Sequence, residues 1–142
     1  VCLTAYSRSL SQILDNHCDI ILVGDSLGMV LYGMESTKQV SIDMMINHAK
    51  SARLGVKKSL FVVDMPFNTY RNKKEAYFNA RKIIKLSNCD ALKLEGGKKI
   101  INIVKHLVKK KFQSWAILVC YLNQKRENLN LREEAKLKET GS

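Results

Sequence analysis

The segment from residue 20 to residue 29, Ile-Ile-Leu-Val-Gly-Asp-Ser-Leu-Gly-Met, constrains the fold more than any other part of the chain. Four consecutive apolar residues lead directly into Gly24, Asp25 and Ser26. A run without polar alternation is typical of a strand buried on both faces, as in a parallel sheet. Asp25 then stands where the strand ends, and this edge of a parallel sheet or barrel is where ligands bind. Taken alone, Asp25 could equally cap the following turn.

Strands and helices are predicted to alternate along the first 110 residues. We expect strands at residues 2–5, 19–24, 60–63 and 91–95, helices at 7–16, 41–54, 74–87 and 98–110, and a long loop at 31–40. The helices are indicated by apolar residues three and four positions apart, and Ser41 is placed to cap the second one. This order specifies a parallel sheet with helices packed outside it.

Two architectures have this order. A complete eight-stranded barrel needs about 250 residues, so four units would form half of one. An open doubly wound sheet is the alternative, but its phosphate-binding glycine fingerprint is missing after the first strand.

The charge and the cysteines exclude several classes of protein. The net charge of +11 would suit nucleic-acid binding, yet the lysines are spread over predicted helix surfaces and no binding motif accompanies them. No apolar run is long enough to span a membrane, and no signal peptide is visible. The four cysteines are widely spaced, which supports neither a zinc site nor a disulfide framework. We therefore expect a cytoplasmic protein with no specific nucleic-acid partner; its start within a strand-like segment suggests a missing N-terminus.

Carboxylates stand at equivalent positions after three successive predicted strands: Asp25, Asp64 and Glu95. Three uncompensated acids on one edge would repel one another, whereas their oxygens suit Mg²⁺. Lys93 lies two residues before Glu95, so both side chains point to the same side of the sheet. It could bind an anionic substrate group, or form a structural ion pair with Asp64 or Glu95.

Other polar residues give weaker signals. The three histidines, His17, His48 and His106, lie on or just after predicted helices, where a surface or packing role is expected. Tyr6 and Tyr70 lie near strand ends and could line a pocket.

Five short motifs follow one another along the chain. They are Thr-Ala-Tyr at 4–6, Ile-Leu-Val-Gly-Asp-Ser-Leu-Gly-Met at 21–29, Ser-Thr at 36–37, Val-Asp-Met-Pro-Phe at 63–67 and Leu-Lys-Leu-Glu-Gly-Gly at 92–97. In this order residues 1–111 resemble ketopantoate hydroxymethyltransferase. The resemblance implies an α/β fold: a (β/α)₈ TIM barrel of the phosphoenolpyruvate/pyruvate-binding type, with about the first four βα units present, and usually a homo-oligomer.

The resemblance also implies a reaction of pantothenate biosynthesis. A folate-dependent transferase would move a hydroxymethyl group from 5,10-methylenetetrahydrofolate to 3-methyl-2-oxobutanoate, giving 2-dehydropantoate. The implied Mg²⁺ ligands are Asp25, Asp64 and Glu95. Glu95 could bind the ion directly or through a water molecule. The implied contacts to the oxo acid are Asp25, Ser26, Asp64 and Lys93. A metal chelated by the 2-oxo and carboxylate oxygens would stabilise the enolate formed when C3 loses its proton.

Two departures from the family pattern precede the tail. Ser7 stands where the family commonly has Asp, and the turn at 15–19 is one residue short. Neither touches the implied metal ligands. The general base is expected beyond residue 142, so no catalytic residue is assigned.

The resemblance stops after Lys111. The family's fifth strand reads like Ile-Pro-Val-Met-Gly-His-Ile-Gly, whereas residues 112–119 read Phe-Gln-Ser-Trp-Ala-Ile-Leu-Val. The codons ATT CCA GTC ATG GGC CAT ATT GGT encode the first peptide, and reading them one base later encodes the second. We therefore interpret residues 112–142 as a frameshifted tail, poorly ordered or loosely helical, and predict an unstable and nearly inactive chain.

Two alternatives remain from the sequence. The chain could belong to another 2-oxo acid lyase or mutase of the same barrel superfamily, because the metal-binding edge is shared. It could also be an inactive, pseudogene-like fragment.

Overall fold

A computed structural model describes residues 1–110 and 116–120, the second range in its backbone alone. Strands and helices alternate through the described residues. The strands are β1 (Cys2–Thr4), β2 (Ile20–Val23), β3 (Leu60–Asp64), β4 (Ala91–Glu95) and β5 (Ala116–Cys120). The helices are α1 (Arg8–Leu14), α2 (Leu27–Tyr32), α3 (Ile42–Arg53), α4 (Lys73–Ser87) and α5 (Ile101–Lys109), with 3-10 turns η1 (Thr37–Gln39) and η2 (Gly97–Ile100).

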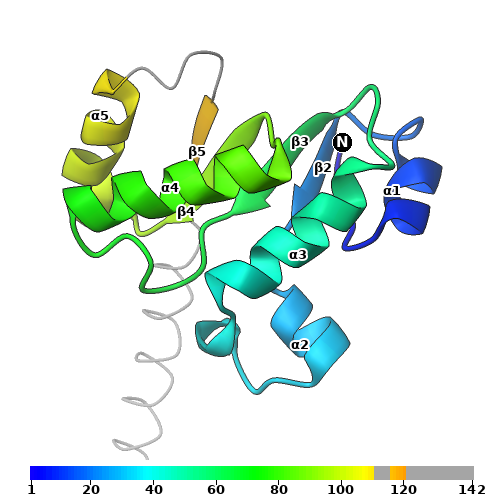
Figure 1. Cartoon of the computed structure of the whole chain (residues 1–142), viewed down its shortest axis with the longest axis horizontal. Coiled ribbons are helices and arrows are strands. Elements are labelled where there is room, and N and C mark those ends of the chain that lie inside the picture. The colour runs from blue at the N-terminus through cyan, green and yellow to red at the C-terminus, as the bar shows by residue number, and fades with distance from the viewer. Residues whose placement is uncertain (111–115, 121–142) are drawn as a thin grey trace, which may run out of the picture.

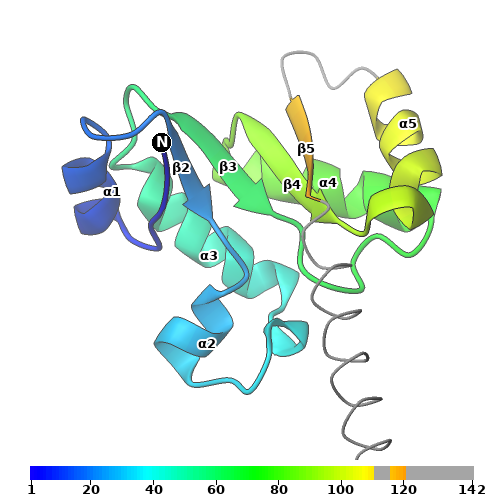
Figure 2. The same cartoon turned by 180° about the vertical axis from the view of Figure 1, so that it is seen from behind.

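The described strands form one parallel sheet in the order β1-β2-β3-β4-β5. Each strand pairs with the next one in the chain, and Ile20 is opposite Leu60 in the β2–β3 pair. Helices α3 and α4 cross one face of this sheet, with α1 and α5 at its two ends (Figures 1 and 2). A strand order that never reverses is that of consecutive βα units of a barrel, whereas a doubly wound sheet reverses at its switch point. The fold class expected from the sequence is confirmed.

The two faces of the sheet differ in character. Ile21, Val23, Phe61 and Val63 are fully buried and belong to the apolar core that packs against the helices. On β2, burial alternates, so the prediction of a strand buried on both faces is corrected. The reason is that no described helix covers the second face, to which every other residue points.

Helix α3 forms where the sequence predicts it. Ser41 caps it by accepting a hydrogen bond from the Met44 backbone N–H at 3.2 Å. The helix buries Met45, Ile46, Ala49 and Ala52, which recur at helical spacing. Its position across β2 and β3 therefore follows from its apolar stripe.

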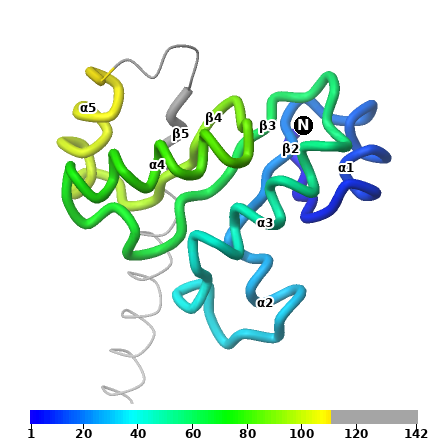
Figure 3. The backbone as a smooth tube through the Cα atoms, in the orientation of Figure 1, coloured from blue at the N-terminus to red at the C-terminus, as the bar shows by residue number. Residues whose placement is uncertain are grey.

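Helix α2 overlaps the start of the loop predicted at 31–40, and η1 lies within that loop, so the prediction is corrected there. The backbone leaves β2, forms α2 and η1, and returns to α3 (Figure 3). Gly33 ends α2 in the left-handed conformation with φ of 65°. Four exposed apolar residues, Met29, Val30, Leu31 and Tyr32, hide the helical periodicity, which is why the sequence did not indicate this helix.

Strand β5 lies within the segment that we predicted to be poorly ordered or loosely helical. Its backbone continues the parallel ladder, with Ala116 opposite Ala91 and Cys120 opposite Glu95. An apolar, β-branched run beside the open edge of β4 explains a strand here, so the prediction is corrected for residues 116–120. The rest of the predicted tail lies outside the described residues. Among the helices described, none has the length and apolar character to cross a membrane.

Candidate functional site

The predicted carboxylates come together at the carboxyl ends of three neighbouring strands. Asp25 follows β2 directly, Asp64 is the last residue of β3, and Glu95 is the last residue of β4. With Lys93 they line one cavity of about 290 Å³, which also receives side chains from the β3–α4 loop, η1 and η2. The sheet therefore brings together four residues that the sequence singled out.

Lys93 lies between two of these acids. Its Nζ donates to Asp64 Oδ1 and to Glu95 Oε1, each at 2.8 Å. The β3–β4 register places Asp64 opposite Lys93, and their side chains are 5% and 13% exposed. The structural ion pair considered from the sequence is formed, and it includes both acids. Because an ammonium group has three N–H donors, one donor is left after these two bonds.

A second contact joins Asp25 to Asp64. The Asp25 backbone N–H donates to Asp64 Oδ2 at 3.2 Å. The Gly-Asp-Ser turn thus holds the end of β2 against the end of β3.

The acids and the lysine respond differently to burial. Burial raises the pKa of Asp25 to about 6, and repulsion from Asp64 and Glu95 adds to it. Lys93 and a hydrogen bond from the Thr37 side chain oppose this rise. Burial also raises the pKa of Asp64. For Lys93, burial disfavours the charge, but attraction to Asp64 and hydrogen bonds to both acids outweigh it and raise its pKa. Lys93 therefore stays protonated near neutral pH.

The acids fit a magnesium ion in part. In the described residues, no three side chains of His, Cys, Asp or Glu lie close enough together to hold a metal ion between them. The carboxylate oxygens nevertheless share one cavity, and the acids repel one another. Mg²⁺ commonly takes one or two carboxylates and completes its shell with water and substrate. The donors suit such a partly hydrated ion better than a closed three-carboxylate site.

Ser26 follows the cavity residue Asp25, and its side chain is held by a hydrogen bond with Tyr6. Its Oγ is 2.8 Å from Tyr6 OH. The Tyr6 carbonyl lies 2.9 Å from His48 Nδ1, and His48 Nε2 lies 2.9 Å from Tyr32 OH. His48 thus ties α3 and α2 to the end of β1, a link that the sequence did not predict. Its position three residues after the buried Met45 was a signal that it lies near the core face of α3.

The structure adds further residues to the predicted set. Of the two tyrosines that could line a pocket, Tyr70 lines the cavity and Tyr6 does not. Lys38 and Lys99 also line it, although the sequence did not single them out. Lys38 Nζ lies 5.5 Å from the centre of the Phe67 ring. With Lys93, these two lysines equal in number the three acids that line the cavity.

Comparison with known proteins identifies the family. The sequence model of the family described as Ketopantoate hydroxymethyltransferase matches residues 1–119. A 3-methyl-2-oxobutanoate hydroxymethyltransferase of Pelagibacter ubique is 65% identical over 111 residues, covering 78% of this chain and 43% of that protein. Enzymes of the same name from Rhizobium etli and Agrobacterium fabrum are 53% and 50% identical, covering 78% and 76% of this chain and 41% and 39% of those proteins.

The chain thus spans about two fifths of the length of the curated relatives that it matches. The match to the family model includes the ends of β2, β3 and β4, which carry the cavity acids. Because it also extends over more than half of the chain, this chain belongs to the ketopantoate hydroxymethyltransferase family.

Proposed function

We propose that this chain is part of an enzyme that transfers a hydroxymethyl group from 5,10-methylenetetrahydrofolate to 3-methyl-2-oxobutanoate, giving 2-dehydropantoate for pantothenate biosynthesis. One observation carries the proposal: in a chain of this family, Asp25, Asp64, Lys93 and Glu95 line a single cavity at three successive strand ends. The names of the relatives supply the oxo acid and the type of transfer.

In this proposal Asp25 and Asp64 hold Mg²⁺ directly, and Glu95 acts through water. The contact between the Asp25 backbone and Asp64 supports the pairing of these two acids. When bound, the ion supplies a Lewis acid for the 2-oxo group of the substrate.

Lys93 has three tasks in the proposed site. It offsets the charge of Asp64 and Glu95, and it fixes both side chains through 2.8 Å hydrogen bonds. Its third N–H donor would bind the substrate carboxylate. Ser26, held by Tyr6, would contact the same oxo acid.

We further propose that the 142-residue chain does not turn over its substrates. No described residue is assigned as the base that removes the C3 proton, and the reading-frame hypothesis leaves the family's later residues unencoded. Resequencing across the codons of Lys109–Lys111 tests the hypothesis, because one additional base in that run would restore the reading frame of the family's fifth strand.

The experiment compares two proteins in the same assay. One is the 142-residue chain, and the other is the product of the gene with one base restored at those codons. We expect the restored product to form 2-dehydropantoate from both substrates, to lose activity with a chelator and to regain it with Mg²⁺. A restored product without hydroxymethyl transfer would contradict the proposed activity, whereas rapid turnover by the 142-residue chain would contradict its inactivity.

A further inference from the structure

We propose that Tyr70 is a positioning residue of this site. Its hydroxyl forms the hydrogen bonds to the Glu95 backbone that a further residue of β3 would otherwise form. The functional meaning rests on the proposed function, in which Glu95 helps to hold the metal and substrate.

The need for such a contact arises where the β3–β4 ladder stops. The Met65 backbone N–H donates to the Lys93 carbonyl at 2.9 Å, so the polar groups of Lys93 face β3. Residues two apart on a strand direct their N–H and C=O groups to the same side, and Glu95 therefore faces β3 as well. Continuing this ladder would pair the Glu95 carbonyl with the N–H two residues after Met65, that of Phe67. However, β3 ends at Asp64, and the chain turns at Pro66, whose carbonyl accepts from the Thr69 backbone N–H.

Tyr70 fills this gap with a single hydroxyl. Its O–H donates to the Glu95 carbonyl at 2.9 Å, and its oxygen accepts from the Glu95 backbone N–H at 3.3 Å. One hydroxyl can donate and accept at once, so it meets both backbone groups of Glu95. The side chain of Tyr70 thus extends the ladder by one residue beyond β3.

The hydrogen bonds between Tyr70 and Glu95 lie at a point where the backbone of β4 changes direction. Gly96 follows with a φ of 143°, a conformation that residues with side chains rarely adopt. Glu95 therefore stands between a ladder bond at Lys93 and a turn at Gly96. Because Glu95 Oε1 meets Lys93 Nζ at 2.8 Å, a shift of its backbone would also disturb the Lys93–Asp64 pair.

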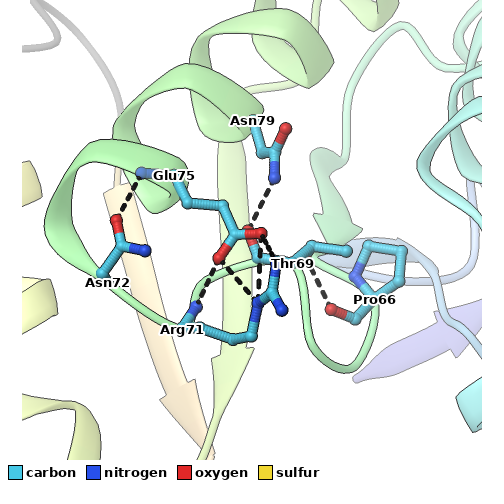
Figure 4. A network of polar contacts seen from close by, with 6 residues as sticks. All are labelled: Pro66, Thr69, Arg71, Asn72, Glu75 and Asn79. Carbon is cyan, nitrogen blue, oxygen red and sulfur yellow. Dashed lines mark hydrogen bonds and ion pairs between the residues drawn. The ribbon is translucent and has the colours of Figure 1, made fainter.

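Tyr70 can hold Glu95 because its own loop is anchored, as Figure 4 shows. On one side, Thr69 Oγ1 donates to the Pro66 carbonyl at 2.6 Å, and Asn79 Nδ2 donates to the Thr69 carbonyl at 2.7 Å. On the other side, the Arg71 guanidinium donates to Glu75 Oε1 at 2.8 Å. Both chain neighbours of Tyr70 are thereby tied to α4 or to the end of β3.

The test is Tyr70→Phe, which keeps the ring in the cavity and removes only the hydroxyl. Tyr77→Phe is the matched control, because Tyr77 is another half-buried tyrosine whose ring contacts His106 on α5, away from the cavity. Both are made in the purified 142-residue chain. The readouts are backbone amide exchange by NMR, the melting temperature, and titration with 3-methyl-2-oxobutanoate in the presence of Mg²⁺.

We expect Tyr70→Phe to speed amide exchange at Glu95 by about tenfold or more and to weaken oxo acid binding by about tenfold, the range that losing a hydrogen bond to a buried group produces. Exchange elsewhere in the sheet and the melting temperature should match those of Tyr77→Phe. Unchanged exchange at Glu95, a uniform increase throughout the sheet, or an unprotected Glu95 amide in the parent chain would each overturn the proposal. If the parent chain binds no oxo acid, the proposed function fails for this chain, and the exchange at Glu95 still decides the role of Tyr70.

Discussion

Asp25 lies at the end of β2 with two other carboxylates nearby, and this neighbourhood sets its titration. Its pKa in the folded chain is raised from 3.8 to about 6, chiefly by burial. Between these values the folded chain binds more protons than the unfolded chain, so the contribution of Asp25 to stability decreases as pH rises through that window. The pKa of Asp15 shifts in the opposite direction. Burial disfavours its charge, but hydrogen bonds from the backbone of Ser59, Lys57 and Lys58 outweigh burial and lower the pKa.

The first prediction isolates Asp25 by comparing Asp25→Asn with the parent chain in Mg²⁺-free buffer. From about pH 4 to pH 7, the parent should lose of the order of 2 kcal/mol of unfolding free energy relative to the variant, since one pKa unit is worth about 1.4 kcal/mol. Urea unfolding at several pH values measures this difference. Parallel stability curves for the two proteins would contradict the prediction.

Lys93 should matter for stability as well as for binding. Lys93→Met would leave the buried Asp64 carboxylate without its cation, and removing one partner of a buried pair typically costs about 3–5 kcal/mol. The control is Lys105→Met, an exposed position on α5 where a change within about 0.5 kcal/mol is expected. Chemical denaturation gives both values. Adding Asp64→Asn to Lys93→Met should recover part of the loss, and equal effects at Lys93 and Lys105 would contradict this account.

At the scale of the elements, the strand ends could be predicted and the contacts between elements could not. Apolar runs followed by Asp25, Asp64 and Glu95 mark the ends of three strands, and parallel pairing makes those ends meet. Tyr70 reaches Glu95 from 25 residues away, and His48 reaches the Tyr6 carbonyl from 42 residues away. Such side-chain to backbone bonds leave no periodic trace in a sequence, because they depend on how two elements pack.

Gly55 illustrates the same limit. Its place after α3 suggests a helix-ending glycine, but its significance lies in the contact with α1. A Cβ atom at Gly55 would lie 2.4 Å from the Arg8 carbonyl oxygen and 2.6 Å from the Gln12 backbone nitrogen. Backbone atoms cannot move aside as a flexible side chain can. The glycine is therefore required by close packing between two helices.

This packing yields the third prediction. Gly55→Ala should destabilise the chain by about 1–3 kcal/mol, the usual cost of forcing an extra methyl group into a packed contact. The neighbouring Leu54→Ala is the control, because Leu54 is 67% exposed and its truncation should change stability by less than about 0.5 kcal/mol. Thermal unfolding followed by circular dichroism compares them. A smaller loss at Gly55 than at Leu54 would show that α1 can move away at little cost.

At the scale of the whole molecule, the helix-covered face and the opposite face of the sheet carry different kinds of side chain. Val63 and Leu92 point toward the helices and are buried with them, whereas Asp64 and Lys93 point to the other face. In the described part of the sheet, β1 and β5 are the edge strands. A closed barrel has no such edges, but an isolated parallel sheet offers unpaired backbone groups to other copies of itself.

The fourth prediction follows from those edges and from the length of the chain relative to its curated relatives. The 142-residue chain should self-associate through its strand edges and unfold at a lower temperature than the frame-restored product, in which further βα units would cover them. Sedimentation velocity over a range of concentrations should give a broad, concentration-dependent distribution for the shorter chain and a single defined species for the restored one. A second comparison separates open edges from loss of core: a proline at Thr4, whose N–H faces away from β2 in edge strand β1, should reduce association of the short chain more than a proline at the exposed Lys73, the first residue of α4. A monodisperse short chain with the melting temperature of the restored product would contradict both the open edges and the instability inferred from the reading frame.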